Sequence, residues 1–151
     1  MEMDQQLYYV SVYLHILGSI IWLGGSLFYA MVLVPALKNH PARKELILAT
    51  GKIFRIISWI TLGIILLTGL YNLHYHGLLN NLLFESRAGQ LALLKMLLFA
   101  FIILLGLLHD VWLGPKLINK TQKYPLIRWI ARIMVIIGLI MIWLGIKIVR
   151  G

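Results

Sequence analysis

The chain contains no cysteine, and this absence removes several classes of protein from consideration. Disulfides, thiolate metal sites and iron–sulfur clusters all require cysteine, as does covalent attachment of haem through a C-x-x-C-H motif. Any bound metal must therefore be held by histidine, methionine, lysine, tyrosine or carboxylate side chains.

Acidic residues are also scarce, since five Asp and Glu stand against fourteen Lys and Arg and give a net charge of +9. A charge of this size can indicate a nucleic-acid-binding protein, but here the basic residues are separated by apolar segments and form no continuous basic face. We therefore expect membrane lipids, and not nucleic acid, to be the partners of these charges.

Polar residues are too few to cover a soluble globule of 151 residues, because 61% of the chain is hydrophobic and its mean hydropathy is +0.89. A hydrocarbon core of ~30 Å needs about 20 apolar residues per helix. Four segments meet this need: residues 7–37, 56–76, 88–113 and 126–148. The sequence predicts an all-α integral membrane protein whose single domain is an antiparallel four-helix bundle.

The connections before the second and fourth segments are rich in basic residues: Lys38, Arg43, Lys44, Lys52, Lys116, Lys120 and Lys123. Because basic loops are retained in the cytoplasm, we expect a multi-pass protein of the inner (cytoplasmic) membrane with both termini outside. Pro35 and Pro115 are expected to close the first and third helices, and Gly77 to cap the second.

The first segment carries a stripe of residues at helical spacing that combines a histidine with small and aromatic side chains: His15, Gly18, Trp22, Gly25 and Tyr29. The glycines would allow a flat ligand or a neighbouring helix to approach the backbone closely. Because an intramembrane histidine is rare and usually functional, we favour a ligand-binding face with His15 as a metal ligand. The alternative is glycine-mediated packing with His15 bonded to a neighbouring helix.

Two histidines, His74 and His76, close the second segment. On a continuous helix they point about 200° apart, so only one can face the bundle. His74 lies slightly deeper in the membrane and is therefore the favoured metal ligand of the two. The alternative is that both lie at the headgroup boundary.

The third segment holds two further candidates, Lys95 and His109. A lysine in this position could bond an anionic group or act as a base or metal ligand, although its long side chain could also extend to the headgroups. His109 is a candidate metal ligand beside Asp110. Adjacent helical residues diverge by about 100°, so Asp110 need not be its partner and could instead pair with Arg55.

The motif His15-x6-Trp22-x-Gly24-Gly25, followed by Pro35, resembles the first helix of copper resistance protein D (CopD)-like membrane proteins. Four later parts of the chain also resemble elements of that family: Ser58-Trp59, Thr68-Gly69, Lys95 and His109-Asp110-x-x-Leu113-Gly114-Pro115. The spacing from His15 to Trp22, with a later lysine and histidine, is also similar to HemJ-type membrane protoporphyrinogen oxidases. The first resemblance implies copper, and the second implies haem bound in a helical bundle.

From these residues we expect a cytochrome b-like membrane protein that binds haem b for electron transfer, haem handling or haem-dependent oxidation. His15 would be the first iron ligand and His74 or His76 the second, with Lys95 near the propionates. The alternative is a copper-binding or copper-transport protein that uses the same histidines. Catalysis is left open. A thin bundle around a large cofactor favours a homodimer, and electron transfer would require a redox partner or quinone.

Overall fold

The computed structural model describes residues 2–78, 85–113 and 125–150, and within these ranges the chain is helical, with no strand. The chain divides into two compact units, Met1–Gly77 and Leu78–Gly151. The described residues include four helices that are long and apolar enough to cross a membrane, with mean hydropathies from 1.9 to 2.8 over their most apolar stretches. The prediction of an all-α, multi-pass membrane protein is confirmed.

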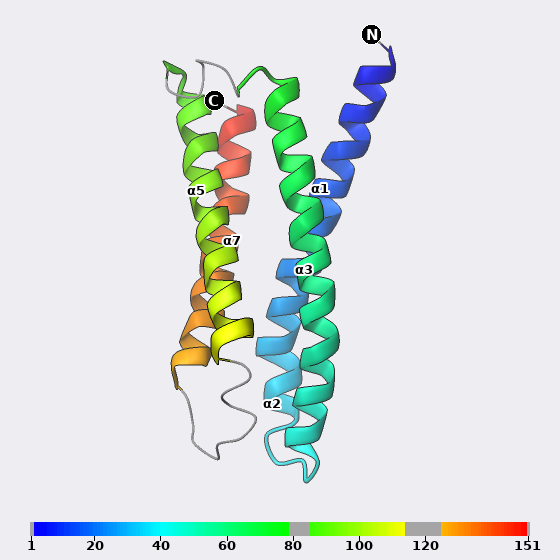
Figure 1. The fold of residues 1–151 in the computed structure, drawn as a ribbon, viewed down its shortest axis with the longest axis vertical. Helices are drawn as coiled ribbons and strands as arrows, with labels where there is room; N and C mark the ends of the chain where they lie inside the picture. Colours follow the sequence, from blue (N-terminus) through cyan, green and yellow to red (C-terminus); the bar gives the residue numbers. More distant parts are fainter. Residues whose placement is uncertain (1, 79–84, 114–124, 151) are drawn as a thin grey trace. The chain divides into compact units, whose positions relative to one another are not determined.

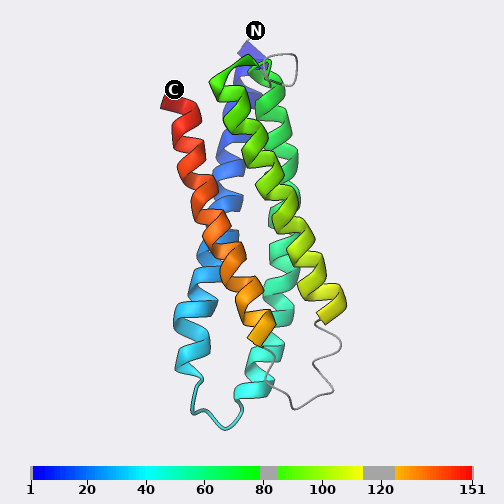
Figure 2. The ribbon, with the colours of Figure 1, turned by 90° about the vertical axis from the view of Figure 1, so that its left-hand side faces the viewer.

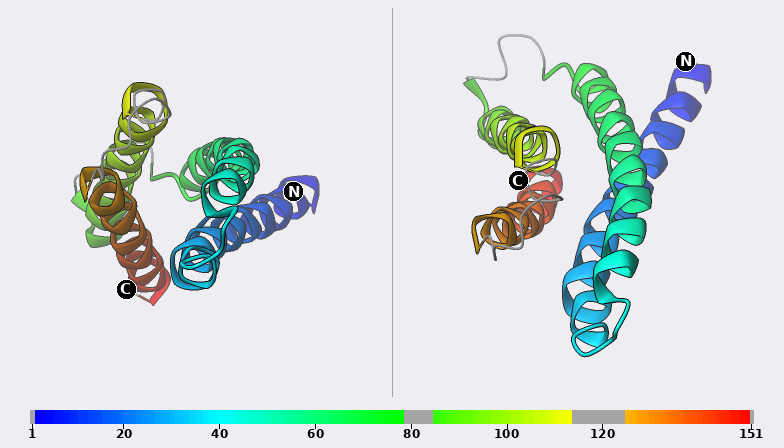
Figure 3. Two further views of the ribbon diagram at one scale, coloured as in Figure 1. Left: turned by 90° about the horizontal axis from the view of Figure 1, so that it is seen from below. Right: turned by 60° about the horizontal axis from the view of Figure 1, so that its bottom comes forward.

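The first unit is an antiparallel helical pair. One span comprises α1 (Glu2–Phe28), the π-helical turn η1 (Tyr29–Leu33) and α2 (Val34–Ala36), and the other is α3 (Arg43–Tyr75). A short turn joins them, and α1 crosses α3 obliquely, as Figures 1 and 3 show. Gly77 follows α3 with a φ of 67° and donates its N–H to the carbonyl of His74, so its predicted role in ending the helix is confirmed.

Both spans of this unit start earlier than their hydropathy suggests. Glu2 and Asp4 lie in the first turn of α1, where negative side chains favour the positive end of the helix dipole. The helix α3 begins at Arg43, although the apolar segment was expected to begin at residue 56. Charged and polar residues are interspersed with apolar ones over these first turns, so hydropathy alone does not locate the start of a helix that continues beyond the hydrocarbon.

The π-helical turn η1 has a local cause in Pro35. The N–H of Val34 bonds to the carbonyl of Tyr29, five residues earlier. Proline lacks an N–H, and its ring collides with the carbonyl four residues before it, so a wider turn ahead of Pro35 relieves the collision. The helix ends soon afterwards at Ala36, close to the predicted end.

The second unit contains α5 (Arg87–Leu107), the π-helical turn η2 (Leu108–Leu113) and α7 (Pro125–Arg150). Figure 2 shows α5 and α7 running alongside each other in opposite directions. Ser86 caps α5 by accepting a hydrogen bond from the N–H of Gly89 at 2.9 Å. The expected end of the third helix at Pro115 and the basic connection at Lys116, Lys120 and Lys123 lie outside the described residues.

Each pair buries a narrow seam of residues, which in the first unit includes Ser11, Thr61 and Thr68, and exposes many large apolar side chains on the rest of its surface. In the second unit, α7 buries a residue every seventh position, Ile130, Ile137 and Leu144, which is the spacing of coiled-coil seams. In the first unit, Leu67 is 70% exposed and Ile20 is 63% exposed. Large aliphatic side chains exposed all along the helices are consistent with lipid as the surrounding solvent.

Candidate functional site

His15 is held by α3 through one of its two ring nitrogens. Its Nδ1 lies 3.1 Å from the carbonyl oxygen of Ile65 and 3.1 Å from the hydroxyl of Thr68. The carbonyl can only accept, and the Thr68 hydroxyl donates its own proton to the carbonyl of Ile64 at 2.6 Å. The proton must therefore be on Nδ1, which leaves the lone pair of a neutral ring on Nε2, the form that binds metals.

Gly69 makes room for this imidazole. A Cβ added at Gly69 would lie 3.2 Å from Cε1 of His15. The adjacent pair Thr68-Gly69 thus has two roles, since the threonine accepts from the ring and the glycine allows the ring to approach α3. The sequence singled out this pair by resemblance alone, without a physical role.

The glycine stripe on α1 packs against α3. A Cβ at Gly18 would lie 3.1 Å from Cγ1 of Ile65, and one at Gly25 would lie 2.5 Å from Cε2 of Phe54. Trp22, between the two glycines, is only 6% exposed. The space that these glycines clear is filled by side chains of α3, which is the packing arrangement described above as the alternative to a flat ligand.

Tyr29 completes the stripe with a packing contact of the same kind. Its hydroxyl donates to the carbonyl of Ile47 at 2.9 Å and lies over Gly51, where an added Cβ would be 3.2 Å away. Its ring stacks on Phe54 with centroids 5.9 Å apart. Tyr29 therefore fixes the end of the α1–α3 pair near the connecting turn.

His76, and not the favoured His74, lies on the side of α3 that faces α1. Nε2 of His76 forms a 3.0 Å hydrogen bond with the hydroxyl of Tyr8, whose ring stacks on Tyr75 with centroids 4.2 Å apart. His74 is exposed. The prediction that only one of the two histidines can face the pair assumed a continuous helix, but α3 ends at Tyr75 and His76 is its C-cap residue.

The seam between α1 and α3 contains further polar groups that sequence reasoning did not select. Ser11 is buried and donates to the carbonyl of Thr68 at 3.3 Å. Asn72 has a buried Oδ1 with no hydrogen-bond partner among the described residues. The spacing of Thr68, Asn72 and His76, four residues each, was the available signal, because such residues share a helix face.

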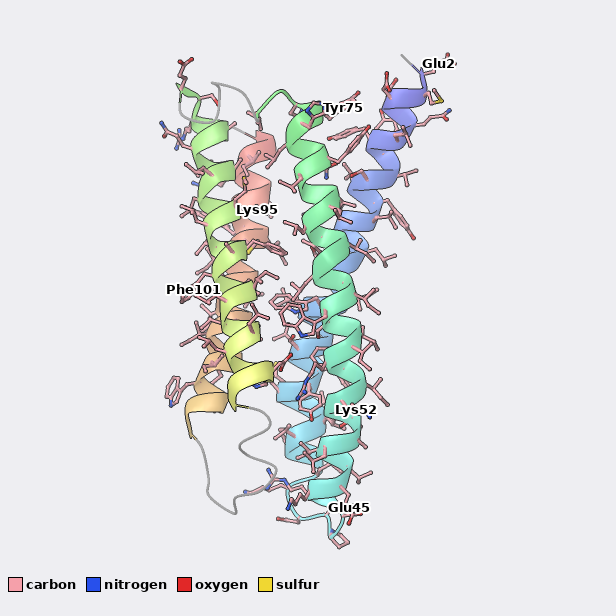
Figure 4. The ribbon with its side chains drawn as sticks, in the orientation of Figure 1. Glu2, Glu45, Lys52, Tyr75, Lys95 and Phe101 are labelled. Atoms are coloured by element: carbon pink, nitrogen blue, oxygen red, sulfur yellow. The ribbon has the colours of Figure 1, made fainter. Side chains whose placement is uncertain are left out.

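Lys95 lies on the side of α5 that faces α7 (Figure 4). A Cβ added at Gly145 of α7 would lie 3.2 Å from its Nζ, and the side chain is half-buried. The amine therefore lies against α7.

His109 and Asp110 are bonded to each other, contrary to the expectation that neighbouring residues diverge. Nδ1 of His109 lies 2.7 Å from Oδ1 of Asp110. Both residues belong to the π-helical turn η2, whose altered geometry departs from the 100° step of an α-helix. This arrangement also directs Nε2 of a neutral His109 away from the carboxylate, as in carboxylate–histidine–metal sites.

The described residues do not gather three or more His, Asp or Glu side chains in any one place that could hold a metal ion. Within the first unit, Thr68 lies at the level of His15. His76 follows Thr68 by eight residues, or about 12 Å along the helix. His15 and His76 thus lie at different depths of the same seam.

A protein-family model described as "Copper resistance protein D" matches residues 48–147 of the chain. This protein belongs to the copper resistance protein D family. The matched range includes Thr68, Gly69, Lys95 and His109, while His15 lies before it. An uncharacterized protein of Aquifex aeolicus (strain VF5) is 28% identical over 142 residues, covering 93% of this chain and 94% of that protein. No solved structure matches significantly.

Proposed function

We propose that this copper resistance protein D family member binds copper as cargo within the membrane, with Nε2 of His15 as a ligand. The main support for this proposal is that Nδ1 of His15 donates to the carbonyl of Ile65 and the hydroxyl of Thr68. A neutral imidazole protonated on Nδ1 has its coordinating lone pair on Nε2. Thr68 and Gly69, which hold the ring, lie inside the range matched by the family model. Imidazole nitrogen suits copper, and no softer thiolate is present in the chain.

A single well-oriented imidazole suits a transported ion better than a stored one. The described part of the chain assembles no cluster of three His, Asp or Glu ligands around His15. Movement through a protein requires each binding step to be weak enough for release. The seam of α1 and α3 thus supports transient binding at His15. In the second unit, the carboxylate-bonded His109 of η2 is a second imidazole of similar chemistry.

Haem b is the less supported cofactor. The glycine face that was expected to clear a macrocycle is occupied by Ile65 and Phe54. His76 is bonded to Tyr8 about 12 Å along the helix from the level of His15, whereas two axial ligands must meet at one iron atom. A homodimer and a redox partner or quinone stay predictions.

We further propose that the protein spans the inner membrane with the α1–α3 turn in the cytoplasm. That end of the first unit carries Lys38, Arg43 and Lys44 against the single acid Glu45, and its other end carries Glu2 and Asp4. Basic residues near span ends favour the cytoplasmic side.

The test is copper content after anaerobic Cu(I) loading and desalting of detergent-purified protein. We expect His15→Gln to lose copper, because glutamine can still donate a hydrogen bond to Ile65 but lacks the imidazole. His40→Gln is the control, since His40 is exposed in the turn outside both helices. Full copper content in His15→Gln would exclude His15 as a ligand, and a Soret band in the purified protein would return haem as the cofactor.

A further inference from the structure

Lys95 is an ionisable side chain inside a membrane span, and no described residue neutralises it. All five acidic residues of the chain lie within the described ranges: Glu2, Asp4, Glu45, Glu85 and Asp110. Lys95 forms no ion pair or hydrogen bond with any of them, nor with another described residue. Ionisable residues within spans are costly and normally pair with a partner, so an anion from outside the chain would stabilise the ammonium form of Lys95.

The absence of a side chain at Gly145 lets the amine of Lys95 lie directly against α7. Gly145 has no side chain, and an added Cβ would come within 3.2 Å of Nζ of Lys95. Any larger residue at this position would compete with the amine or with a group bound to it. The glycine thus allows the polar end of Lys95 to lie close to the backbone of α7.

The depth of the amine identifies the source of the anion. Gly145 lies five residues before Arg150, the last residue of α7, or about 7 Å along the helix. Lys147, at the same end of α7, lies over the ring of Trp143 at 4.5 Å, a pairing suited to the headgroup boundary. The ammonium is therefore within reach of lipid phosphates, the abundant anions at this level of a membrane.

We propose that Lys95 and Gly145 form a binding site for the phosphate of an anionic phospholipid. A lipid with net negative charge is favoured over a zwitterionic one, because the headgroup ammonium of the latter already neutralises its phosphate. The site uses no residue of the α1–α3 pair and is independent of copper binding at His15.

The test compares lipid retention by purified full-length variants. Protein in detergent is equilibrated with equal amounts of phosphatidylglycerol and phosphatidylcholine, and the bound lipids are quantified by mass spectrometry. Lys95→Gln should lower the preference for phosphatidylglycerol more than about fivefold, because about fivefold corresponds to the ~1 kcal/mol of any basic residue near an anionic surface and is the most expected of the control. Lys147→Gln is the matched control, since it removes an exposed charge at the same end of the helix pair.

A second variant separates the site from net charge alone. Gly145→Ala keeps every charge but narrows the space at Nζ, so it should also reduce phosphatidylglycerol retention. Equal losses in Lys95→Gln and Lys147→Gln, or an unchanged preference in Lys95→Gln, would overturn the proposal. Displacement of the lipid by millimolar inorganic phosphate would overturn the lipid source and identify a free-phosphate site; we expect no displacement, because the amine lies below the membrane surface.

Discussion

Gly25→Ala offers a direct measurement of how closely α1 and α3 pack. The added methyl would lie 2.5 Å from Cε2 and 3.3 Å from Cζ of Phe54, well inside van der Waals contact. The Phe54 ring cannot retreat freely, because it stacks on Tyr29, whose hydroxyl is held by the carbonyl of Ile47. Overpacking of this kind costs about 1–3 kcal/mol.

The neighbouring glycine supplies the control. Gly24 is exposed, and no described atom outside its own helix would lie within 4 Å of an added Cβ. Both substitutions gain the helix propensity of alanine, up to about 1 kcal/mol, so that contribution cancels in the comparison. We expect Gly25→Ala to be less stable than Gly24→Ala by about 1–3 kcal/mol.

The assay is reversible unfolding in mixed detergent micelles, followed by circular dichroism. A second step uses Phe54→Leu, which removes the ring atoms that meet the new methyl. In that background Gly25→Ala should behave like Gly24→Ala, and the double-mutant cycle should report the coupling between the two positions. Equal stability of the two alanine variants in the wild-type background would refute the close approach of the helices.

Two further predictions concern the polar seam and the orientation of the chain. Asn72→Leu should raise the free energy of unfolding by about 1–3 kcal/mol, because it removes a buried acceptor without a described partner, and a loss of stability in the same detergent assay would contradict this. A reporter fused in the turn at Lys38–His40 should give a cytoplasmic signal and one fused at Gly77 an outside signal, and the reverse pattern would overturn the proposed orientation.

The fold was largely predictable because membrane helices follow from hydropathy alone. Lipid offers the backbone no hydrogen-bond partners, so an apolar stretch of sufficient length must be helical. The boundaries were less predictable, as the early start of α3 at Arg43 shows. Charged residues mark where a helix leaves the hydrocarbon, not where its hydrogen bonding ends. The association of the two helix pairs into one bundle stays a prediction.

The glycine stripe shows why the role of a helix face is harder to predict than its existence. Gly18 and Gly25 were correctly placed on the face of His15. The same pattern of small residues, however, predicts close approach either of a ligand or of another helix. Only the partner residues, Ile65 and Phe54, decide between them. Their positions depend on the register of α1 against α3, which short-range spacing does not contain.

The pairs His74/His76 and His109/Asp110 share one reason for their unexpected arrangement. Both interpretations assumed a regular step of 100° per residue, yet each pair lies where the α-helix ends or changes type. His76 follows the last residue of α3, and the two bonded residues lie in the π-helical turn η2. Helix ends and π-helical turns redirect side chains while leaving the hydropathy pattern unchanged, and they occur often at functional sites. Two of the histidines predicted as metal ligands, His76 and His109, are found at such positions, so their direction has to come from the structure.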